Sequence, residues 1–224
     1  MKNKNDKEHG LTLSDNSEVY YDKNDLYVSF AEAEDSLGLV EKALRPEIKG
    51  KVVIDIGCGT GKYVRLFKPY TQFITGIDLS PQQVLIAGEG SDAKFIVAGA
   101  DKIPYPDNFF DVAYETWCLS CIGDLEVREK AFAEMERVVK PGGKIILVEN
   151  DEGGEFDEIL KESSEFRDSM LNRGFSVKEK IKTQFKFKTV EEARRVFGDV
   201  LGERGKQVSS NIIKHNIIIF EKLV

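Results

Sequence analysis

The stretch VVIDIGCGTG at residues 52–61 constrains the fold of this chain more than any other segment. Its first residues are apolar and mostly β-branched, which is typical of a buried strand. Three alternating glycines follow, and the apolar residues after Lys62 have helical spacing. Glycines permit a tight turn and let a ligand approach the backbone closely. The segment therefore predicts a strand, a ligand-binding turn and a helix N-terminus, where free N–H groups favour a negatively charged group.

The spacing of these glycines excludes two common nucleotide-binding loops. A dinucleotide fingerprint requires G-x-G-x-x-G, and a P-loop requires G-x-x-x-x-G-K-[ST]. Here Gly57, Gly59 and Gly61 are separated by single residues, and an acidic residue, Asp55, precedes them. The loop is therefore expected to bind another kind of ligand.

Predicted strands and helices alternate along the chain. The apolar patterns predict strands at 51–56, 73–77, 94–98, 110–115, 144–149, 179–187 and 214–222, and helices at 26–45, from Pro81, at 125–139, 155–172 and 189–201. Such alternation indicates an α/β fold with a parallel sheet covered on both faces. Ligands of these sheets bind beyond the carboxyl ends of the strands, where Asp55, Asp78 and Glu115 are expected to converge.

Four segments, in order, resemble motifs of the class I S-adenosylmethionine (SAM)-dependent methyltransferases. They are D-x-G-x-G-x-G at 55–61, the strand and acid of FITGIDLS at 73–80, the adenine loop and strand of AGADKIPYPDNFFDVAY at 98–114, and the turn and strand of VVKPGGKIILVEN at 138–150. The likeness is greatest to the small-molecule branch that includes the ubiquinone and menaquinone methylases. The resemblance implies a single doubly wound, Rossmann-like domain, with a mostly parallel seven-stranded sheet and an antiparallel C-terminal strand. It also implies SAM as the cofactor.

The resemblance further implies roles for individual residues. The glycine loop would lie against the amino-acid part of SAM, near Asp55, and Asp78 would accept hydrogen bonds from the ribose hydroxyls. Gly99 stands where the family usually has an adenine-binding acid, so Ala100 and Asp101 become the candidates, unless Asp101 is a solvated loop residue. The candidate cofactor residues are Asp55, Gly57, Cys58, Gly59, Gly61, Asp78, Leu79, Ala100, Asp101 and Glu115.

The acceptor site is less well defined by the sequence. Methyl transfer from a sulfonium requires mainly orientation and exclusion of water, so a good nucleophile needs no strong base. We expect the acceptor to lie between residues 114–122 and the segment 18–27. Trp117 and Asn150 are candidate substrate residues, and Glu149 and Tyr21 are the candidates for catalysis. His215 is interpreted as a strand-end or surface residue rather than a base.

Composition narrows the classes of partner. The net charge of −7 disfavours nucleic acid, which binds basic surfaces, so we expect a small neutral or cationic acceptor. No apolar run approaches the roughly 20 residues of a membrane span, and the polar start resembles no secretory signal, so a cytoplasmic location is expected. Three cysteines do not indicate a disulfide framework. Cys58, Cys118 and Cys121 are interpreted as neutral thiols rather than as a metal site.

The domain division follows from these patterns. Residues 1–16 are expected to be a disordered tail, and 17–224 one methyltransferase domain. Within it, 17–50 would be a helical lid, 51–150 the SAM-binding core, and 151–224 the C-terminal helices and closing strand pair. The main alternative function is a SAM- or S-adenosylhomocysteine-binding module without catalysis, and protein, RNA or arsenite methylation is less favoured. The sequence leaves a homodimer open.

Overall fold

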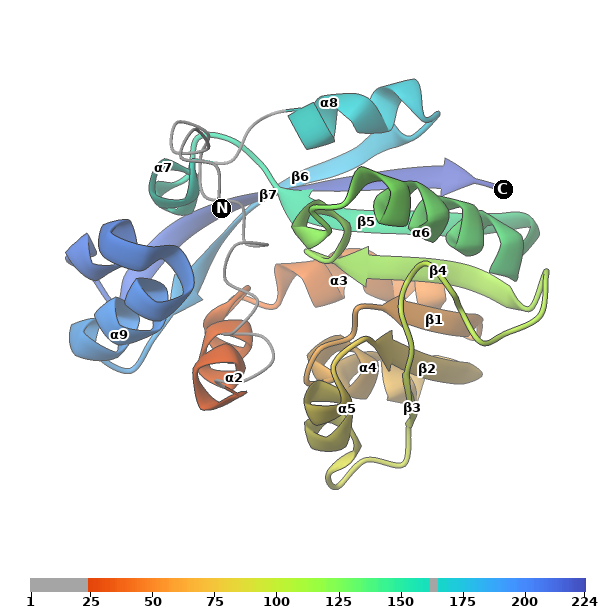
Figure 1. Cartoon of the computed structure of the whole chain (residues 1–224), viewed down its shortest axis with the longest axis horizontal. Helices are drawn as coiled ribbons and strands as arrows, with labels where there is room; N and C mark the ends of the chain where they lie inside the picture. The colour runs from red at the N-terminus through yellow and green to blue at the C-terminus, as the bar shows by residue number, and fades with distance from the viewer. Residues whose placement is uncertain (1–23, 162–164) are drawn as a thin grey trace, which may run out of the picture.

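A seven-stranded sheet runs through the centre of the molecule (Figure 1). The computed structural model describes residues 24–161 and 165–224. Along the sheet the order is β3-β2-β1-β4-β5-β7-β6. Only β7 runs opposite to its neighbours, β5 and β6, so the predicted doubly wound α/β fold is confirmed. The strands are β1 (Val52–Ile56), β2 (Phe73–Asp78), β3 (Lys94–Val97), β4 (Phe110–Thr116), β5 (Val139–Asn150), β6 (Ser176–Lys186) and β7 (Ile212–Leu223).

Helices cover both faces of this sheet. One apolar core forms between the sheet and helices α6 and α8, and another between the sheet and helices α3 and α4. A third cluster joins α2, α7 and α9 to the ends of β6 and β7. Figure 1 shows these three helices beyond the carboxyl end of β4, which is the side on which parallel sheets bind ligands. The α-helices are α2 (Asn24–Ala33), α3 (Leu39–Ile48), α4 (Lys62–Phe67), α5 (Pro81–Gly88), α6 (Leu125–Val138), α7 (Glu155–Leu160), α8 (Glu165–Asn172) and α9 (Val190–Leu201), and the 3₁₀ helices are η2 (Lys68–Tyr70), η3 (Leu119–Cys121) and η4 (Gly202–Gln207).

The N-terminal helix differs from the expectation of one helix over 26–45. It is divided into α2 and α3 because Asp35 adopts a left-handed conformation, with φ 46°. The Asp35 carboxylate then accepts hydrogen bonds from the N–H groups of Leu39, at 3.0 Å, and Val40, at 2.9 Å. These bonds satisfy free donors at the start of α3. This second helix continues past Pro46 to the fully buried Ile48.

Two other predicted boundaries were also wrong. The helix expected over 155–172 is two helices, since Lys161 ends α7 with φ 52°. The strand expected from residue 144 begins at Val139 and includes the predicted Pro-Gly-Gly turn as an irregularity. Its pairing with β4 moves from Phe110↔Val139 to Val112↔Lys144.

Other predicted boundaries are confirmed by their caps. The Ser80 hydroxyl accepts a hydrogen bond from the N–H of Gln83 at the start of α5. The Asp124 carboxylate accepts bonds from the N–H groups of Glu126 and Val127 at the start of α6. Both caps directly follow segments at the carboxyl end of the sheet, so they fix the loops that surround the site. No helix in the described part of the chain has the length and apolarity needed to cross a membrane.

Candidate cofactor and acceptor site

A cavity of about 500 Å³ lies beyond the carboxyl ends of β1, β2 and β4. The glycine loop, the end of β2, the loop after β3 and the loop after β4 form most of its wall, and α2 contributes one tyrosine. The lining residues are Tyr27, Gly57, Asp78, Leu79, Ser80, Gln83, Ala98, Gly99, Ala100, Asp101, Thr116, Trp117, Cys118, Cys121, Ile122, Gly123, Asp124 and Val127.

The glycine loop has a backbone that side chains rarely tolerate. Gly57, Gly59 and Gly61 have φ angles of 70°, 50° and 78°, in the left-handed region. A Cβ on Gly57 would lie 2.3 Å from the Cys118 sulfur, and one on Gly59 would lie 2.6 Å from the Tyr27 hydroxyl oxygen. The glycines thus allow both the turn and the close approach of α2 and the loop after β4.

Two carboxylates lie near the ends of β1 and β2, the buried Asp55 and the half-buried Asp78. Asp78 accepts hydrogen bonds from the N–H groups of Gly59, at 2.9 Å, and Ser80, at 2.8 Å. Burial raises its pKa. Asp55 is 1% exposed, and within the described residues its Oδ1 atom has no hydrogen-bond partner. Burial also raises the pKa of Asp55 well above its usual range. A cation bound beside these groups would stabilise their charged forms.

In the loop after β3, the Asp101 side chain lies where the expected adenine-binding side chain at position 99 would be. A Cβ on Gly99 would lie 2.4 Å from Oδ1 of Asp101. The Asp101 carboxylate therefore occupies the space that a side chain at position 99 would take. Ala100, Asp101 and Leu79 all line the cavity.

Buried acids hold the loop after β4 in place. Glu115 accepts hydrogen bonds from the N–H groups of Cys118, at 2.7 Å, Leu119, at 3.2 Å, and Val148, at 3.2 Å. Glu149 accepts bonds from the N–H and hydroxyl of Ser120. Burial raises the pKa of Glu115 to about 7, although the hydrogen bonds from these three N–H groups lower it. Neither acid lines a described cavity.

A smaller cavity of about 50 Å³ adjoins the first. The two cavities share four lining residues, Tyr27, Gly57, Thr116 and Trp117. Aromatic rings and four polar side chains, Glu34, Thr60, Lys62 and Asn150, are among the residues that complete the wall of the smaller one. Its remaining lining residues are Phe30, Ala31, Glu34, Cys58, Thr60, Lys62, Tyr63, Asn150 and Phe156.

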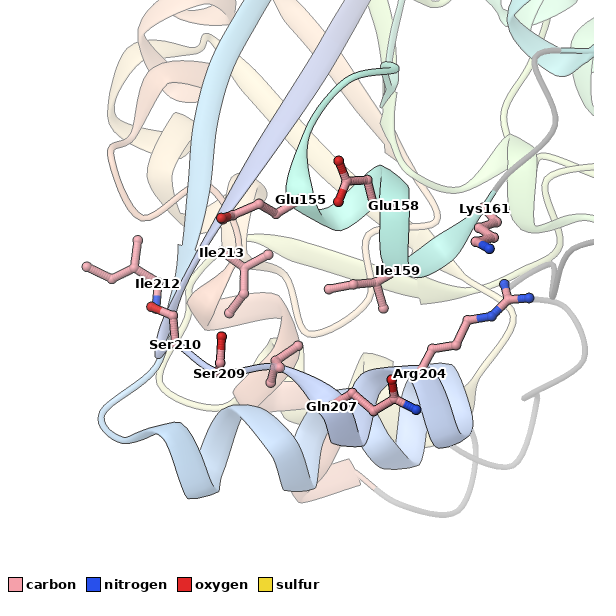
Figure 2. A pocket seen from close by; sticks show the side chains of 11 residues that line it. Glu155, Glu158, Ile159, Lys161, Arg204, Gln207, Ser209, Ser210, Ile212 and Ile213 are labelled. Atoms are coloured by element: carbon pink, nitrogen blue, oxygen red, sulfur yellow. The ribbon is translucent and has the colours of Figure 1, made fainter.

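Another cavity, of about 520 Å³, lies between α7, η4 and the start of β7 (Figure 2). Figure 2 shows Ile159 and Ile213 pointing into it, with Lys161 and Arg204 together at one end. It includes no residue of the glycine loop or of β2. Two acidic and two cationic side chains line it, Glu155, Glu158, Lys161 and Arg204, so it lacks both the glycine loop and the acid at the end of β2 that the expected cofactor requires.

Comparisons with known proteins show the family to which the chain belongs. A methyltransferase domain family matches residues 54–147, which include the glycine loop and the fourth and fifth strands. An uncharacterised methyltransferase of Bacillus subtilis, YcgJ, is 31% identical over 175 residues. That alignment covers 75% of this chain and 66% of YcgJ. The chain belongs to the class I SAM-dependent methyltransferase family.

Further relatives place the chain within that family. The ubiquinone/menaquinone biosynthesis C-methyltransferase UbiE of Hahella chejuensis is 32% identical over 110 residues, covering 45% of this chain and 43% of UbiE. The chain thus spans only part of the curated relatives that it matches. The crystal structure of YcgJ superposes with a TM-score of 0.58 and 20% identity, covering 84% of this chain and 97% of that structure. At this identity the superposition shows the shared fold alone.

The residues around the larger cavity fit SAM. SAM has an ammonium and a sulfonium, and the site has two carboxylates, Asp78 in the cavity wall and the buried Asp55 behind the glycine loop. Asp55 lines neither cavity, so it would act on the ammonium of SAM through water or through its negative charge. Asp78 already lines the cavity, where a ribose diol could donate to it. These assignments, with Ala100 and Asp101 for the adenine, stay predictions.

The other sequence-predicted residues are distributed over the two cavities. Trp117 and Asn150 both line the smaller cavity, and Cys58 lines it too. The remaining predicted cofactor residues line neither cavity and lie behind the walls: Asp55, Gly59, Gly61 and Glu115. Tyr21 and the tail at 1–16 lie outside the described residues.

Sequence reasoning missed three residues near these cavities. Glu34 and Lys62 line the smaller one, whereas Tyr27, which lines both, belongs to the segment 18–27 that was expected to border the acceptor. His215, expected at a strand end or surface, is instead 1% exposed and bonded to Asn150. The helical spacing of α2 gave a weak signal for Tyr27 and Glu34, whereas nothing near His215 in sequence indicated its surroundings.

The three cysteines are free thiols. Over 24–161 and 165–224, no three His, Cys, Asp or Glu side chains are grouped as a metal site. The absence of a metal site stays a prediction.

Proposed function

We propose that this protein transfers the methyl group of SAM to a small-molecule acceptor. The supporting observation is a pair of adjoining cavities at the carboxyl end of the sheet, one bordered by the glycine loop and Asp78 and the other lined by aromatic rings. The four shared residues mean that ligands in the two cavities would touch. SAM supplies an electrophilic methyl group on a cationic sulfur.

The residues of this chain would act mainly by orientation. The carboxylate of Asp78, held by the N–H groups of Gly59 and Ser80, is fixed before a ribose arrives. Tyr27, on α2, and Trp117, on the loop after β4, border both cavities and would exclude water from the space between the ligands. Such placement accounts for much of the acceleration of a displacement reaction.

The net charge of −7 supports a small molecule rather than a nucleic acid as the acceptor. A cytoplasmic location is part of the same proposal. The proposal leaves the oligomeric state unassigned.

The test combines binding with turnover. Calorimetry should show SAM and S-adenosylhomocysteine binding at one site, and methyl-labelled SAM should label at least one compound in a metabolite panel. The Asp78→Ala variant should bind both compounds more weakly and label less product, whereas Glu32→Gln, an exposed change on α2, should match wild type in both. If the wild-type chain binds neither compound, the proposal is wrong.

A second candidate function is a SAM- or S-adenosylhomocysteine-binding module without catalysis. The observation that favours it is the departure at Gly99, where Asp101 occupies the side-chain space. Tight binding of SAM with no labelled product across the panel would support this function over methyl transfer.

A further inference from the structure

A buried carboxyl and a buried imidazole face each other at the smaller cavity. Glu34, near the end of α2, is 8% exposed and lines that cavity. Its Oε1 atom lies 3.9 Å from Nδ1 of His215, on β7. Within the described residues, Nδ1 has no hydrogen-bond partner. Buried polar atoms without partners are rare in folded proteins and invite a functional explanation.

The surroundings of His215 fix its orientation. Its Nε2 lies 2.9 Å from Oδ1 of Asn150, at the end of β5. The ring of Phe185 stacks on the imidazole at 4.9 Å between centroids, and Phe156 meets it edge-on at 4.8 Å. With Oδ1 of Asn150 as the acceptor, Nε2 carries the hydrogen and Nδ1 presents its lone pair toward Glu34.

We propose that Glu34 is the general base for the acceptor, that His215 is its positioning residue, and that the acceptor is a small neutral compound with a weakly acidic hydroxyl, such as a phenol or enol. This proposal rests on the proposed methyl transfer. Glu34 borders the cavity that adjoins the cofactor site, so its carboxyl can reach a bound hydroxyl. His215 lies behind it and acts through it.

The protonation of Glu34 suits this role. Burial raises its pKa to about 8, although Lys62 lowers it, and Asp35 adds to the rise. Efficient bases have a pKa close to the working pH. Burial lowers the pKa of His215 to about 3, so the imidazole stays neutral beside it. The other titratable groups facing Glu34 are the phenols of Tyr27 and Tyr63, whose pKa values burial raises well above 10.0.

The charge of the cavity selects the acceptor class. Lys62 extends from α4, and its ammonium donates to the carbonyl oxygens of Ala31 and Glu34 at the end of α2. In the reactive form, the ionised Glu34 and the ammonium of Lys62 are the two formal charges among the residues that line this cavity, so the cavity has no net charge before the transfer. The ammonium and the neighbouring sulfonium stabilise an oxygen that becomes an anion as its proton passes to Glu34, whereas a cationic amine would find no net counter-charge there. The aromatic walls favour a planar body.

The proposed step balances without a further reactant. The acceptor oxygen forms a bond to the methyl carbon, and the carbon–sulfur bond breaks with its electron pair left on the sulfur. The hydroxyl proton goes to the Glu34 carboxylate, which later releases it to solvent. The rate should therefore rise with pH as Glu34 loses its proton, with a midpoint near pH 8 and a plateau above it.

Histidine NMR tests the Glu34–His215 pair without an acceptor. The chain has two histidines, His9 and His215, so ¹⁵N-histidine labelling gives two imidazole spin systems. We expect the imidazole of His215 to stay uncharged from pH 5 to 9. Its ¹⁵N chemical shifts should nevertheless change with a midpoint near pH 8, because the neighbouring Glu34 loses its proton there. Glu34→Gln should remove that midpoint, and Glu32→Gln should keep it. Titration of both imidazoles near the ordinary histidine pKa, or survival of the midpoint in Glu34→Gln, would overturn the pairing.

Turnover tests the base and the acceptor class. Phenols, enols, amines and thiols of similar size are incubated with labelled SAM between pH 6 and 9. We expect hydroxyl compounds to be methylated, with kcat falling by about 100-fold or more in Glu34→Gln and KM changing little. In His215→Gln, kcat should fall less and the pH midpoint should move. Preference for amines or thiols, or no labelled hydroxyl compound, overturns the acceptor class.

The proposed function and this inference fail differently. Loss of SAM binding in the wild-type chain contradicts the function itself. Normal SAM binding with wild-type kcat in Glu34→Gln contradicts only the role of Glu34.

Discussion

The buried histidine should make the protein sensitive to acid. His215 is 1% exposed, and burial lowers its pKa from 6.5 to about 3. In the unfolded chain the imidazole takes up a proton below about pH 6.5, whereas in the folded chain it does not. The contribution of the buried neutral His215 to the free energy of unfolding is thus fully present above pH 6.5 and is lost as the pH falls toward 3. At pH 5 this loss amounts to about 2 kcal/mol, since each pH unit below the unfolded pKa costs about 1.4 kcal/mol.

The assay compares wild type with His215→Gln, which keeps an amide donor for Asn150. Urea unfolding at pH 8, 7, 6 and 5 gives the free energy of unfolding of each protein. Raised carboxyl pKa values, as at Glu115, act in the opposite direction, but both proteins share them. The difference between the two proteins should therefore shift by about 2 kcal/mol in favour of the variant from pH 8 to pH 5. A constant difference would refute a buried neutral His215.

Three further predictions concern the cofactor cavity. Asp78→Ala should weaken SAM binding by roughly 1–3 kcal/mol, because charge-assisted bonds to a ribose are lost; unchanged affinity by calorimetry would contradict this. Gly59→Val should abolish SAM binding while the circular dichroism spectrum stays near that of wild type, since a side chain at φ 50° meets the Tyr27 hydroxyl. Normal SAM binding by this variant would show that the SAM pocket lies elsewhere. Asp101→Ala should weaken SAM and S-adenosylhomocysteine equally, by about 1 kcal/mol, and a loss specific to SAM would place Asp101 near the sulfonium rather than the adenine.

The local patterns predicted much of the fold, because a strand followed by a glycine turn and a helix is encoded in adjacent residues. Asp78 was placed at the cavity for this reason. Helix breaks were missed where one residue overrides periodicity, as Asp35 does by capping a new helix. The Glu34–His215 pair was missed because its members lie on the first described helix and the last strand. The pairing of β7 with β5 and β6 places His215, and the packing of α2 against the ends of β6 and β7 brings Glu34 to it.

The most direct test of the whole account is a crystal structure with bound S-adenosylhomocysteine. The account predicts the ribose hydroxyls on Asp78, the amino-acid end along the glycine loop, the adenine beside Ala100 and Asp101, and the sulfur facing the cavity that Glu34 lines. S-adenosylhomocysteine bound instead between α7 and η4, or with its sulfur turned away from Glu34, would contradict it.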